Sequence, residues 1–212
     1  MNFIFKFKES FYHYYKKNLF VIVFLGPDGS GKSSLISELM NQYKSIGFNY
    51  YSHIYPNLNH KFVINNFYPY SKKPYSKIIS NLKVLFMVIK NLSSYLLIFL
   101  FKKKAKTIIW CDRYIYDIFA DPERYRLKEF FLSFNFIKRI TFTPDLIFIL
   151  NPSINAILER SSEISRGELI KQSKNYDQLS ILLPEGILFK KDDSIKNMSK
   201  NCKFYIDQVL YN

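Results

Sequence analysis

The sequence predicts an α/β fold of the doubly wound type, in which helices cover both faces of a five-stranded parallel sheet. One observation is the apolar run 19–25, which passes directly into a glycine-rich loop and then into a segment with helical spacing of apolar residues. The other is the alternation of apolar runs with helical stretches along the rest of the chain. The further strands are expected at 50–55, 106–112, 146–150 and 186–191. Strands joined in this way lie parallel, with right-handed crossovers.

Length and composition indicate one domain over 19–212, preceded by a separate segment at 1–18. A chain of 212 residues with 48% hydrophobic and 18% aromatic residues can bury a core, which excludes a disordered protein. The net charge of +14 comes mostly from lysines spread along the chain, and no nucleic-acid-binding motif accompanies them, so we expect no nucleic-acid partner. The two cysteines, Cys111 and Cys202, are too few for a disulfide framework and suit a reducing cytoplasm, where we expect the protein.

Residues 1–18 have the pattern of a basic aromatic helix. Phe3, Phe7, Phe11 and Tyr14 share one helical face, and lysines lie elsewhere. The segment lacks the unbroken apolar core of a signal peptide. Three interpretations stay open, namely packing on the domain, packing on a second subunit as in a homodimer, and weak contact with a membrane surface.

The loop after the first strand carries a phosphate-binding motif. Residues 26–33, GPDGSGKS, match the P-loop pattern G-x-x-x-x-G-K-[ST] between a strand and a helix. Its backbone N–H groups are expected to hold the phosphates of ATP, with Lys32 on the β- and γ-phosphates and the Ser33 hydroxyl on Mg²⁺. A helix that starts at about Ser33 adds a partial positive charge. The predicted ATP-binding residues are Gly26, Pro27, Asp28, Gly29, Ser30, Gly31, Lys32, Ser33 and Ser34.

Two long segments follow the second strand. Residues 56–77 contain several prolines and predict a long loop, and loops of this length usually carry function or cover a site. Residues 82–101 are apolar enough to span a membrane, but Lys90 falls in the middle and the strands on either side belong to one sheet. We therefore expect a long, mostly buried helix. Shallow membrane association stays open, because three lysines follow at 102–104.

The third strand ends in Asp112-Arg113-Tyr114. A carboxylate at the C-terminal end of a parallel strand lies in the crevice where such sheets bind ligands, so Asp112 is a candidate Mg²⁺ ligand of the Walker-B type. Its alternative is a helix N-cap paired with Arg113. The next residues predict a helix, a turn at 121–122 and a second helix start, which form either a charged lip over the crevice or an ordinary solvated face.

A basic helical region follows the fourth strand. After Asn151, the helical stretch carries Arg160, Arg166 and further lysines around a break at Gly167. A basic helical pair above a phosphate site is typical of a lid that neutralises the transferring phosphoryl group, which we place at about 159–175. A charged surface helix is the alternative. The C-terminal helix is expected to carry Met198, Cys202, Tyr205, Ile206 and Val209 inward.

Taken together, these motifs resemble thymidylate kinase and its relatives, which are P-loop NTPases of the nucleoside monophosphate kinase type. The resemblance covers about 19–210 and rests on GPDGSGK, on the strand end CDRY, and on TPDLIFIL before a helix with Arg160 and Glu163. It implies a five-stranded core sheet, ATP and Mg²⁺ as donor, Arg113 near the acceptor phosphate, and Asp28 facing the acceptor's sugar hydroxyl.

The sequence departs from that family at the acceptor side. The family's T-R-E-P-G segment is replaced by HIYPNLNHK, which has no arginine, and Asn151 stands where relatives often have Asp. The stretch DRYIYDIFADPERYR resembles a thymidylate-kinase-like subgroup associated with surface-polysaccharide gene clusters. An acceptor phosphate would therefore be held by Arg113, with Arg124 or Arg126 as a helper.

The sequence thus predicts an ATP-dependent phosphotransferase whose acceptor is a nucleoside monophosphate of the dTMP type. Two alternatives stay open, namely a kinase that acts on a sugar or glycan hydroxyl with Asp28 as base, and an ATP-dependent switch or peripheral membrane adaptor without an acceptor. The predicted catalytic residues are Lys32, Arg113, Arg160, Arg166 and Asp28. The predicted acceptor contacts are Asp28, Arg113, Tyr114, Asp117, Arg124 and Arg126.

Overall fold

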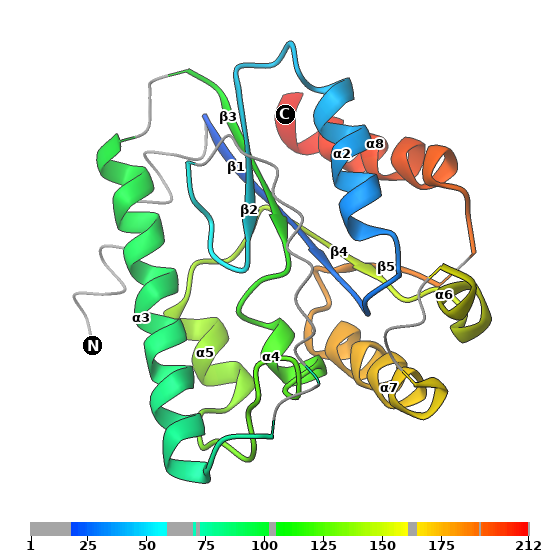
Figure 1. The fold of residues 1–212 in the computed structure, drawn as a ribbon. Coiled ribbons are helices and arrows are strands. Elements are labelled where there is room, and N and C mark those ends of the chain that lie inside the picture. Colours follow the sequence, from blue (N-terminus) through cyan, green and yellow to red (C-terminus); the bar gives the residue numbers. More distant parts are fainter. Residues whose placement is uncertain are drawn as a thin grey trace.

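A parallel sheet of five strands, in the order β2-β3-β1-β4-β5, forms the centre of the molecule (Figure 1). The computed structural model describes residues 18–58, 70, 73–101, 105–160, 165–190 and 192–211. The strands are β1 (Leu19–Leu25), β2 (Phe48–His53), β3 (Thr107–Asp112), β4 (Leu146–Leu150) and β5 (Ile187–Phe189). The predicted fold class is confirmed, because all neighbouring strands pair in parallel.

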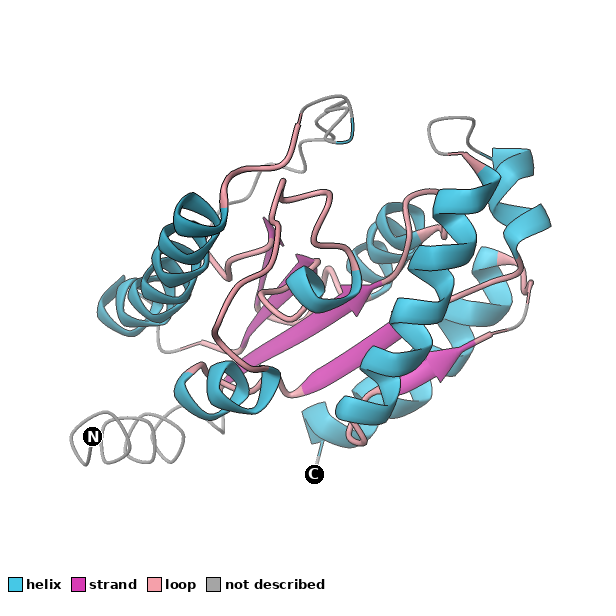
Figure 2. Cartoon of the chain, turned by 90° about the horizontal axis from the view of Figure 1, so that it is seen from below, coloured by secondary structure: helices cyan, strands magenta, loops and turns pink. Residues whose placement is uncertain are grey.

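Helices lie on both sides of the sheet (Figure 2). They are α2 (Lys32–Gln42), α3 (Lys77–Phe101), α4 (Asp117–Ala120), α5 (Phe134–Ile140), α6 (Ile154–Arg160), α7 (Arg166–Leu182) and α8 (Ile195–Tyr211). Successive residues of β1 pack alternately against the helices on the two faces of the sheet. Val21 and Val23 join the core cluster with α3, α4, α5 and α7, whereas Ile22 and Phe24 join the cluster with α2 and α8. This alternation, repeated in β3, explains why the central strands read as unbroken apolar runs.

The central strand β1 places the loop that follows it at the crevice of the sheet. It pairs with β3 through Phe24 and Asp112, and with β4 through Leu25 and Ile149. The C-terminal ends of these three strands therefore meet at one edge of the sheet. In open α/β sheets, ligands bind beyond these ends, where the strand order reverses. The P-loop at 26–33 lies at this position (Figure 1).

The second strand begins two residues earlier than predicted, at Phe48 instead of residue 50. Gly47 has φ 55° and lies so close to the neighbouring chain that a Cβ there would be 1.9 Å from the Lys106 carbonyl oxygen. This close approach lets the Phe48 N–H donate to the Lys106 carbonyl at 2.9 Å, which starts the pairing with β3. The strand ends before Ile54, whose φ is 66°.

Two predicted helix boundaries are wrong. The second helix start after residue 122 is absent, because residues 122–126 form turns and α5 begins only at Phe134. The break in the basic region does not fall at Gly167, which lies inside α7. The Ser165 hydroxyl accepts from the Glu168 N–H and caps α7, so the local capping pattern outweighs the glycine.

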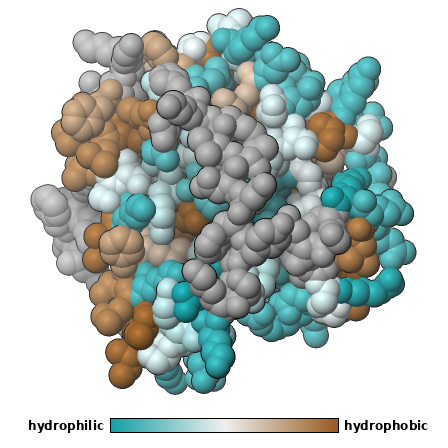
Figure 3. All heavy atoms as spheres, in the orientation of Figure 1, coloured by the Kyte–Doolittle hydropathy of each residue, from teal (hydrophilic) through white to brown (hydrophobic). Residues whose placement is uncertain are grey.

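The helix α3 is not mostly buried, as predicted, but buried along one face only. Val84 and Ile98 pack into the core, whereas Ile78, Leu82 and Phe86 are between 61% and 74% exposed. Apolar side chains gather over α3 at the left of Figure 3. The helix is long and apolar enough to cross a membrane by length and composition, although one face packs on the sheet. On this side of the sheet the described residues form a single helical layer, and the outer face of α3 is exposed at Ile78, Leu82 and Phe86.

The one-sided burial of α3 predicts opposite outcomes for two neighbouring, isomeric side chains. Ile98→Ala should lower the free energy of unfolding by about 2–5 kcal/mol, because Ile98 is 1% exposed in the core. Leu97→Ala removes a similar volume from a side chain that is 53% exposed and should cost below about 0.5 kcal/mol. Urea unfolding of both variants measures the difference. Equal losses would contradict the one-sided packing.

The predicted helix at 1–18 lies outside the described residues up to residue 17, and so do the lysines at 102–104. The helix, the second subunit and the membrane contact therefore stay predictions. Residue 163 and part of the predicted lid, at 161–164, also lie outside the described residues.

Candidate active site

The P-loop has the backbone shape that a phosphate cradle needs. Gly26 follows β1 with φ 144°, and a Cβ there would lie 2.2 Å from the Leu150 carbonyl oxygen, so only glycine fits. Gly29 and Gly31 have φ of 79° and 92°, in the left-handed region. The loop then enters α2, which begins at Lys32 and aims its first backbone N–H groups at the loop. This geometry suits a phosphate, and phosphate binding at 26–33 stays a prediction.

The Lys32 side chain lies within the loop instead of reaching into solvent. It is 5% exposed, and its Nζ donates to the carbonyls of Gly26 at 2.8 Å and Pro27 at 2.6 Å. The Ser30 hydroxyl lies 3.3 Å from the same Nζ. Burial lowers the pKa of Lys32 to about 8, and the positive charge of Arg113 acts in the same direction. Three neutral oxygens thus hold the amine at the place where phosphate oxygens would bind.

The predicted metal ligands, Ser33 and Asp112, contact one another. The Ser33 hydroxyl donates to Asp112 Oδ2 at 3.0 Å, and the Tyr51 hydroxyl donates to the same oxygen at 3.2 Å. Asp112 Oδ1 is buried and has no hydrogen-bond partner within the described part of the chain. Burial favours a raised pKa of Asp112, but Lys32 and Arg113 lower it below its ordinary value. An ionised carboxylate with a free oxygen beside a hydroxyl fits a hard cation such as Mg²⁺.

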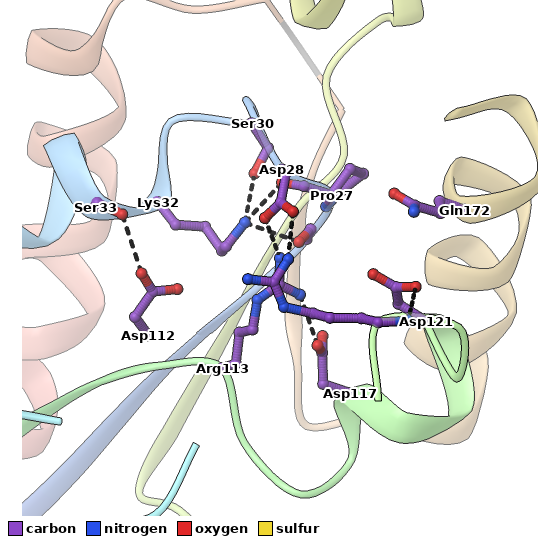
Figure 4. A network of polar contacts seen from close by, with 12 residues as sticks. Pro27, Asp28, Ser30, Lys32, Ser33, Asp112, Arg113, Asp117, Asp121 and Gln172 are labelled. Carbon is purple, nitrogen blue, oxygen red and sulfur yellow. Dashed lines mark hydrogen bonds and ion pairs between the residues drawn. The ribbon is translucent and has the colours of Figure 1, made fainter. Parts of the chain in front are cut away.

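Two arginines bind the carboxylate of the P-loop residue Asp28, and Figure 4 shows Arg113 beside it. Arg113 Nη2 lies 2.5 Å from Asp28 Oδ1, and Arg124 Nη1 pairs with the other oxygen, Oδ2. Burial favours a raised pKa of Asp28, but the two guanidinium groups lower it far below its usual range. Asp28 therefore stays ionised and is a poor proton acceptor, which disfavours its predicted alternative role as a base.

Arg113 is a buried charge of the site, at 1% exposed. Its φ of 77° turns the chain sharply after β3 and sends the guanidinium under the P-loop. Besides Asp28, it binds Asp117 Oδ2 at 2.6 Å and the Tyr176 hydroxyl at 3.1 Å. These partners, drawn from α4 and α7, fix the guanidinium in one orientation.

Asp117 lies behind Arg113 and does not face the acceptor region as predicted. It is fully buried, and it accepts from the hydroxyls of Tyr176 at 2.7 Å and Tyr125 at 2.9 Å as well as from Arg113. These three donors occupy the carboxylate. Asp117 is therefore a positioning residue for Arg113.

Two other predicted acceptor contacts lie elsewhere. Tyr114 is fully buried in the core on the α3 side, where its hydroxyl donates to the Phe142 carbonyl at 2.6 Å. Arg126 packs over the Tyr75 ring at 4.0 Å and donates through Nε to the Lys73 carbonyl at 3.0 Å. The backbone turns at Arg113 and Arg126 direct these side chains, and spacing in the sequence does not reveal such turns.

The predicted lid arginines differ in position. Arg160 ends α6, and its Nη1 would lie 3.9 Å from a Cβ on Gly31, which places the guanidinium beside the P-loop. Arg166 is exposed in the first turn of α7. Ser34, predicted to bind ATP, is exposed on α2 next to Ser33. A closing motion of 159–175 stays a prediction.

Sequence reasoning missed a second polar group beside the site. The Tyr70 hydroxyl donates to Asp121 Oδ2 at 2.5 Å and accepts from Gln172 Nε2 at 3.1 Å. Burial raises the pKa of Asp121 to about 6, although Arg113 acts against this rise. Tyr176 and Tyr125, the partners of Asp117, were missed too. One available signal was the spacing of Gln172 and Tyr176 on the buried side of α7.

The parallel sheet, the P-loop after β1 and the Asp-Arg pair after β3 define a P-loop fold of the nucleoside monophosphate kinase type. Comparison with solved structures agrees, and the chain has a thymidylate-kinase-like fold. A thymidylate kinase from Candida albicans, described as broad in substrate specificity, superposes with a TM-score of 0.60 at 16% identity over 90% of this chain and 92% of the other.

Two further structures share the fold. A thymidylate kinase from Ehrlichia chaffeensis matches with a TM-score of 0.57 at 13% identity, covering 89% of this chain and 99% of that one. The YorR protein from Bacillus subtilis, solved in complex with phosphorylated GDP, matches with a TM-score of 0.55 at 13% identity, covering 89% and 96%. No family model matches the sequence, and no curated protein matches it.

Proposed function

We propose that this protein is an ATP-dependent phosphotransferase, similar to thymidylate kinase, that transfers the γ-phosphate of ATP to a small acceptor. The observation that carries the proposal is that two clusters of charged and polar side chains lie beside the P-loop. Lys32, Ser33 and Asp112 form one group, in which Ser33 contacts Asp112 (Figure 4). Arg113 and Arg124, which both bind Asp28, form the other. Phosphoryl transfer needs such positioned charge and little covalent chemistry from the protein.

The donor half would work through position and charge. The backbone of 26–33 and the Lys32 amine would hold the β- and γ-phosphates, and Arg160 would approach from the lid side. Ser33 and the free oxygen of Asp112 would hold Mg²⁺. When bound, this ion supplies positive charge against the phosphate oxygens.

The acceptor half favours a phosphate-bearing acceptor, with a nucleoside monophosphate of the dTMP type as the first choice. Arg113 and Arg124 present two guanidinium groups around a single carboxylate. Guanidinium groups match phosphate oxygens in geometry and charge. The solved structures with this fold, which include thymidylate kinases and a protein with phosphorylated GDP bound, support a nucleotide acceptor. A sugar or glycan hydroxyl is less supported, because Asp28 is a poor base here.

A screen for acceptor-stimulated ADP release tests the proposal. Purified protein with ATP and Mg²⁺ is mixed in turn with nucleoside monophosphates, sugars and sugar phosphates. We expect a nucleoside monophosphate to raise ADP release about 100-fold or more above basal hydrolysis, because the acceptor phosphate completes the charged site. Slow hydrolysis that no acceptor stimulates, but that a partner protein or lipid does, would instead identify the switch or adaptor.

A further inference from the structure

Gln172 is a polar residue on the buried face of α7. Leu169, Tyr176 and Leu179 share this face, and Gln172 is 1% exposed. Its side-chain oxygen, Oε1, is buried without a hydrogen-bond partner in the described ranges of the chain. An unpaired amide oxygen in the interior lowers stability, and a leucine at this position would avoid that loss. Folding stability therefore does not explain the presence of a glutamine at this position.

A chain of hydrogen bonds determines which way the amide points. The Tyr70 hydroxyl gives its one hydrogen to Asp121 Oδ2 at 2.5 Å, so it can only accept from Gln172, at 3.1 Å. The group facing Tyr70 must therefore be the Nε2 of Gln172, which leaves Oε1 on the other side. Asp121 Oδ1 accepts from the Arg124 N–H at 3.2 Å. Within this group, Gln172 Oε1 is therefore the oxygen left to accept a hydrogen bond from a ligand.

This group adjoins the acceptor half of the site. Arg124 links the two, because its backbone binds Asp121 while its guanidinium binds Asp28. Figure 4 shows Gln172 reaching from α7 toward Pro27 and Asp28, on the side opposite Lys32. The helix is held in place nearby, since Asn175 Nδ2 donates to the Ala120 carbonyl at 2.8 Å. Gln172 Oε1 is thus a hydrogen-bond acceptor in a fixed position, beside the site proposed for the phosphoryl acceptor.

We infer that Gln172 Oε1 accepts a hydrogen bond from the phosphoryl acceptor and selects acceptors that present an O–H or N–H at this point. Tyr70 and Asp121 are positioning residues, because they orient the amide. The matching ligand group is a sugar hydroxyl or the N–H edge of a nucleobase. A carbonyl or a phosphate oxygen would face another acceptor here and be disfavoured. The inference rests on the proposed function, since it concerns the acceptor of that site.

The test measures acceptor binding without turnover. Dissociation constants of the full chain are determined by thermal shift for two pairs of nucleotides, UMP with dUMP and dTMP with its 3-N-methyl derivative. The first pair differs in a sugar hydroxyl and the second in a base N–H. The wild type should bind the donor-bearing member of one pair about tenfold more tightly. Gln172→Leu should lose this preference and melt no lower than the wild type.

A matched control is Gln178→Leu, the same change at an exposed position of α7, which should keep the wild-type preference. Tyr70→Phe, which frees the amide to turn, should reduce the preference and provides a second variant. The inference is overturned if the wild type binds none of the four nucleotides or distinguishes neither pair. It is equally overturned if Gln172→Leu keeps the preference, or melts lower as for a structural glutamine.

The two proposals fail separately. A wild type that shows the preference but never releases ADP supports the role of Gln172 and contradicts phosphoryl transfer. A wild type that phosphorylates an acceptor without distinguishing either pair contradicts the role of Gln172 alone.

Discussion

Lys32→Met is expected to reduce acceptor-dependent ADP release about 1,000-fold while leaving the protein folded. The Lys32 amine lies among the carbonyls of the P-loop, where it would face the β- and γ-phosphate oxygens. Removing one such preorganised donor typically costs about 100- to 1,000-fold in turnover, and here a full charge is lost as well. Steady-state ADP release with a saturating acceptor measures the effect. Lys44→Met, at an exposed position after α2, is the matched control and should keep wild-type turnover.

The stability of the same variant follows from the pKa of Lys32. Burial lowers this pKa from 10.5 to about 8, so between these values the unfolded chain binds more protons than the folded one. Stability therefore rises with pH across this window, and below pH 8 the charged amine opposes folding by its full amount. Lys32→Met should melt at or above the wild-type temperature at pH 7, and this advantage should shrink as pH rises through the window. A variant that melts far lower, or that keeps its turnover, would contradict the assignment.

Arg113→Met is expected to remove acceptor-dependent turnover and also to destabilise the fold by about 3–5 kcal/mol. The loss of stability arises because Asp117, which is fully buried, would lose its ion-pair partner. The loss of turnover arises because Arg113 is a main element of the proposed clamp for the acceptor phosphate. Urea unfolding and ADP release measure the two effects on the same protein.

A compensated double variant separates these two causes. The hydroxyls of Tyr176 and Tyr125 bind different oxygens of Asp117. In Arg113→Met/Asp117→Asn, the amide oxygen accepts from one of these hydroxyls and the amide NH2 donates to the other, and no buried charge remains unpaired. Most of the stability should return, while turnover with every phosphate acceptor should stay absent. Arg126→Met, which changes an arginine packed on Tyr75, should keep its activity. Efficient turnover in the double variant would show that the acceptor phosphate binds elsewhere.

The parts of this protein that sequence alone predicted are those set by local pattern. Leu19–Leu25 is confirmed with its predicted bounds, because a run that is apolar on both faces fits only the middle of a covered parallel sheet. The loop at 26–33 could be recognised because its glycines serve backbone angles that other residues rarely adopt. The sequence could place Ser33 and Asp112 in one metal site because the P-loop follows the C-terminal end of one strand and Asp112 ends the neighbouring parallel strand, and these ends meet at one edge of the sheet.

The tertiary structure decided where each side chain points and what covers it. The consecutive residues Arg113 and Tyr114 diverge, one to the P-loop and one to the core, because of a single backbone turn at φ 77°. The exposed face of α3 depends on how many layers cover the sheet, which the apolar pattern of the helix does not encode. The contact of Gln172 with Tyr70 joins residues 102 positions apart in sequence, so only the packing of α7 against the site brings them together. Burial and long-range hydrogen bonds are properties of the folded chain, and they determine which of the many polar residues belong to the site.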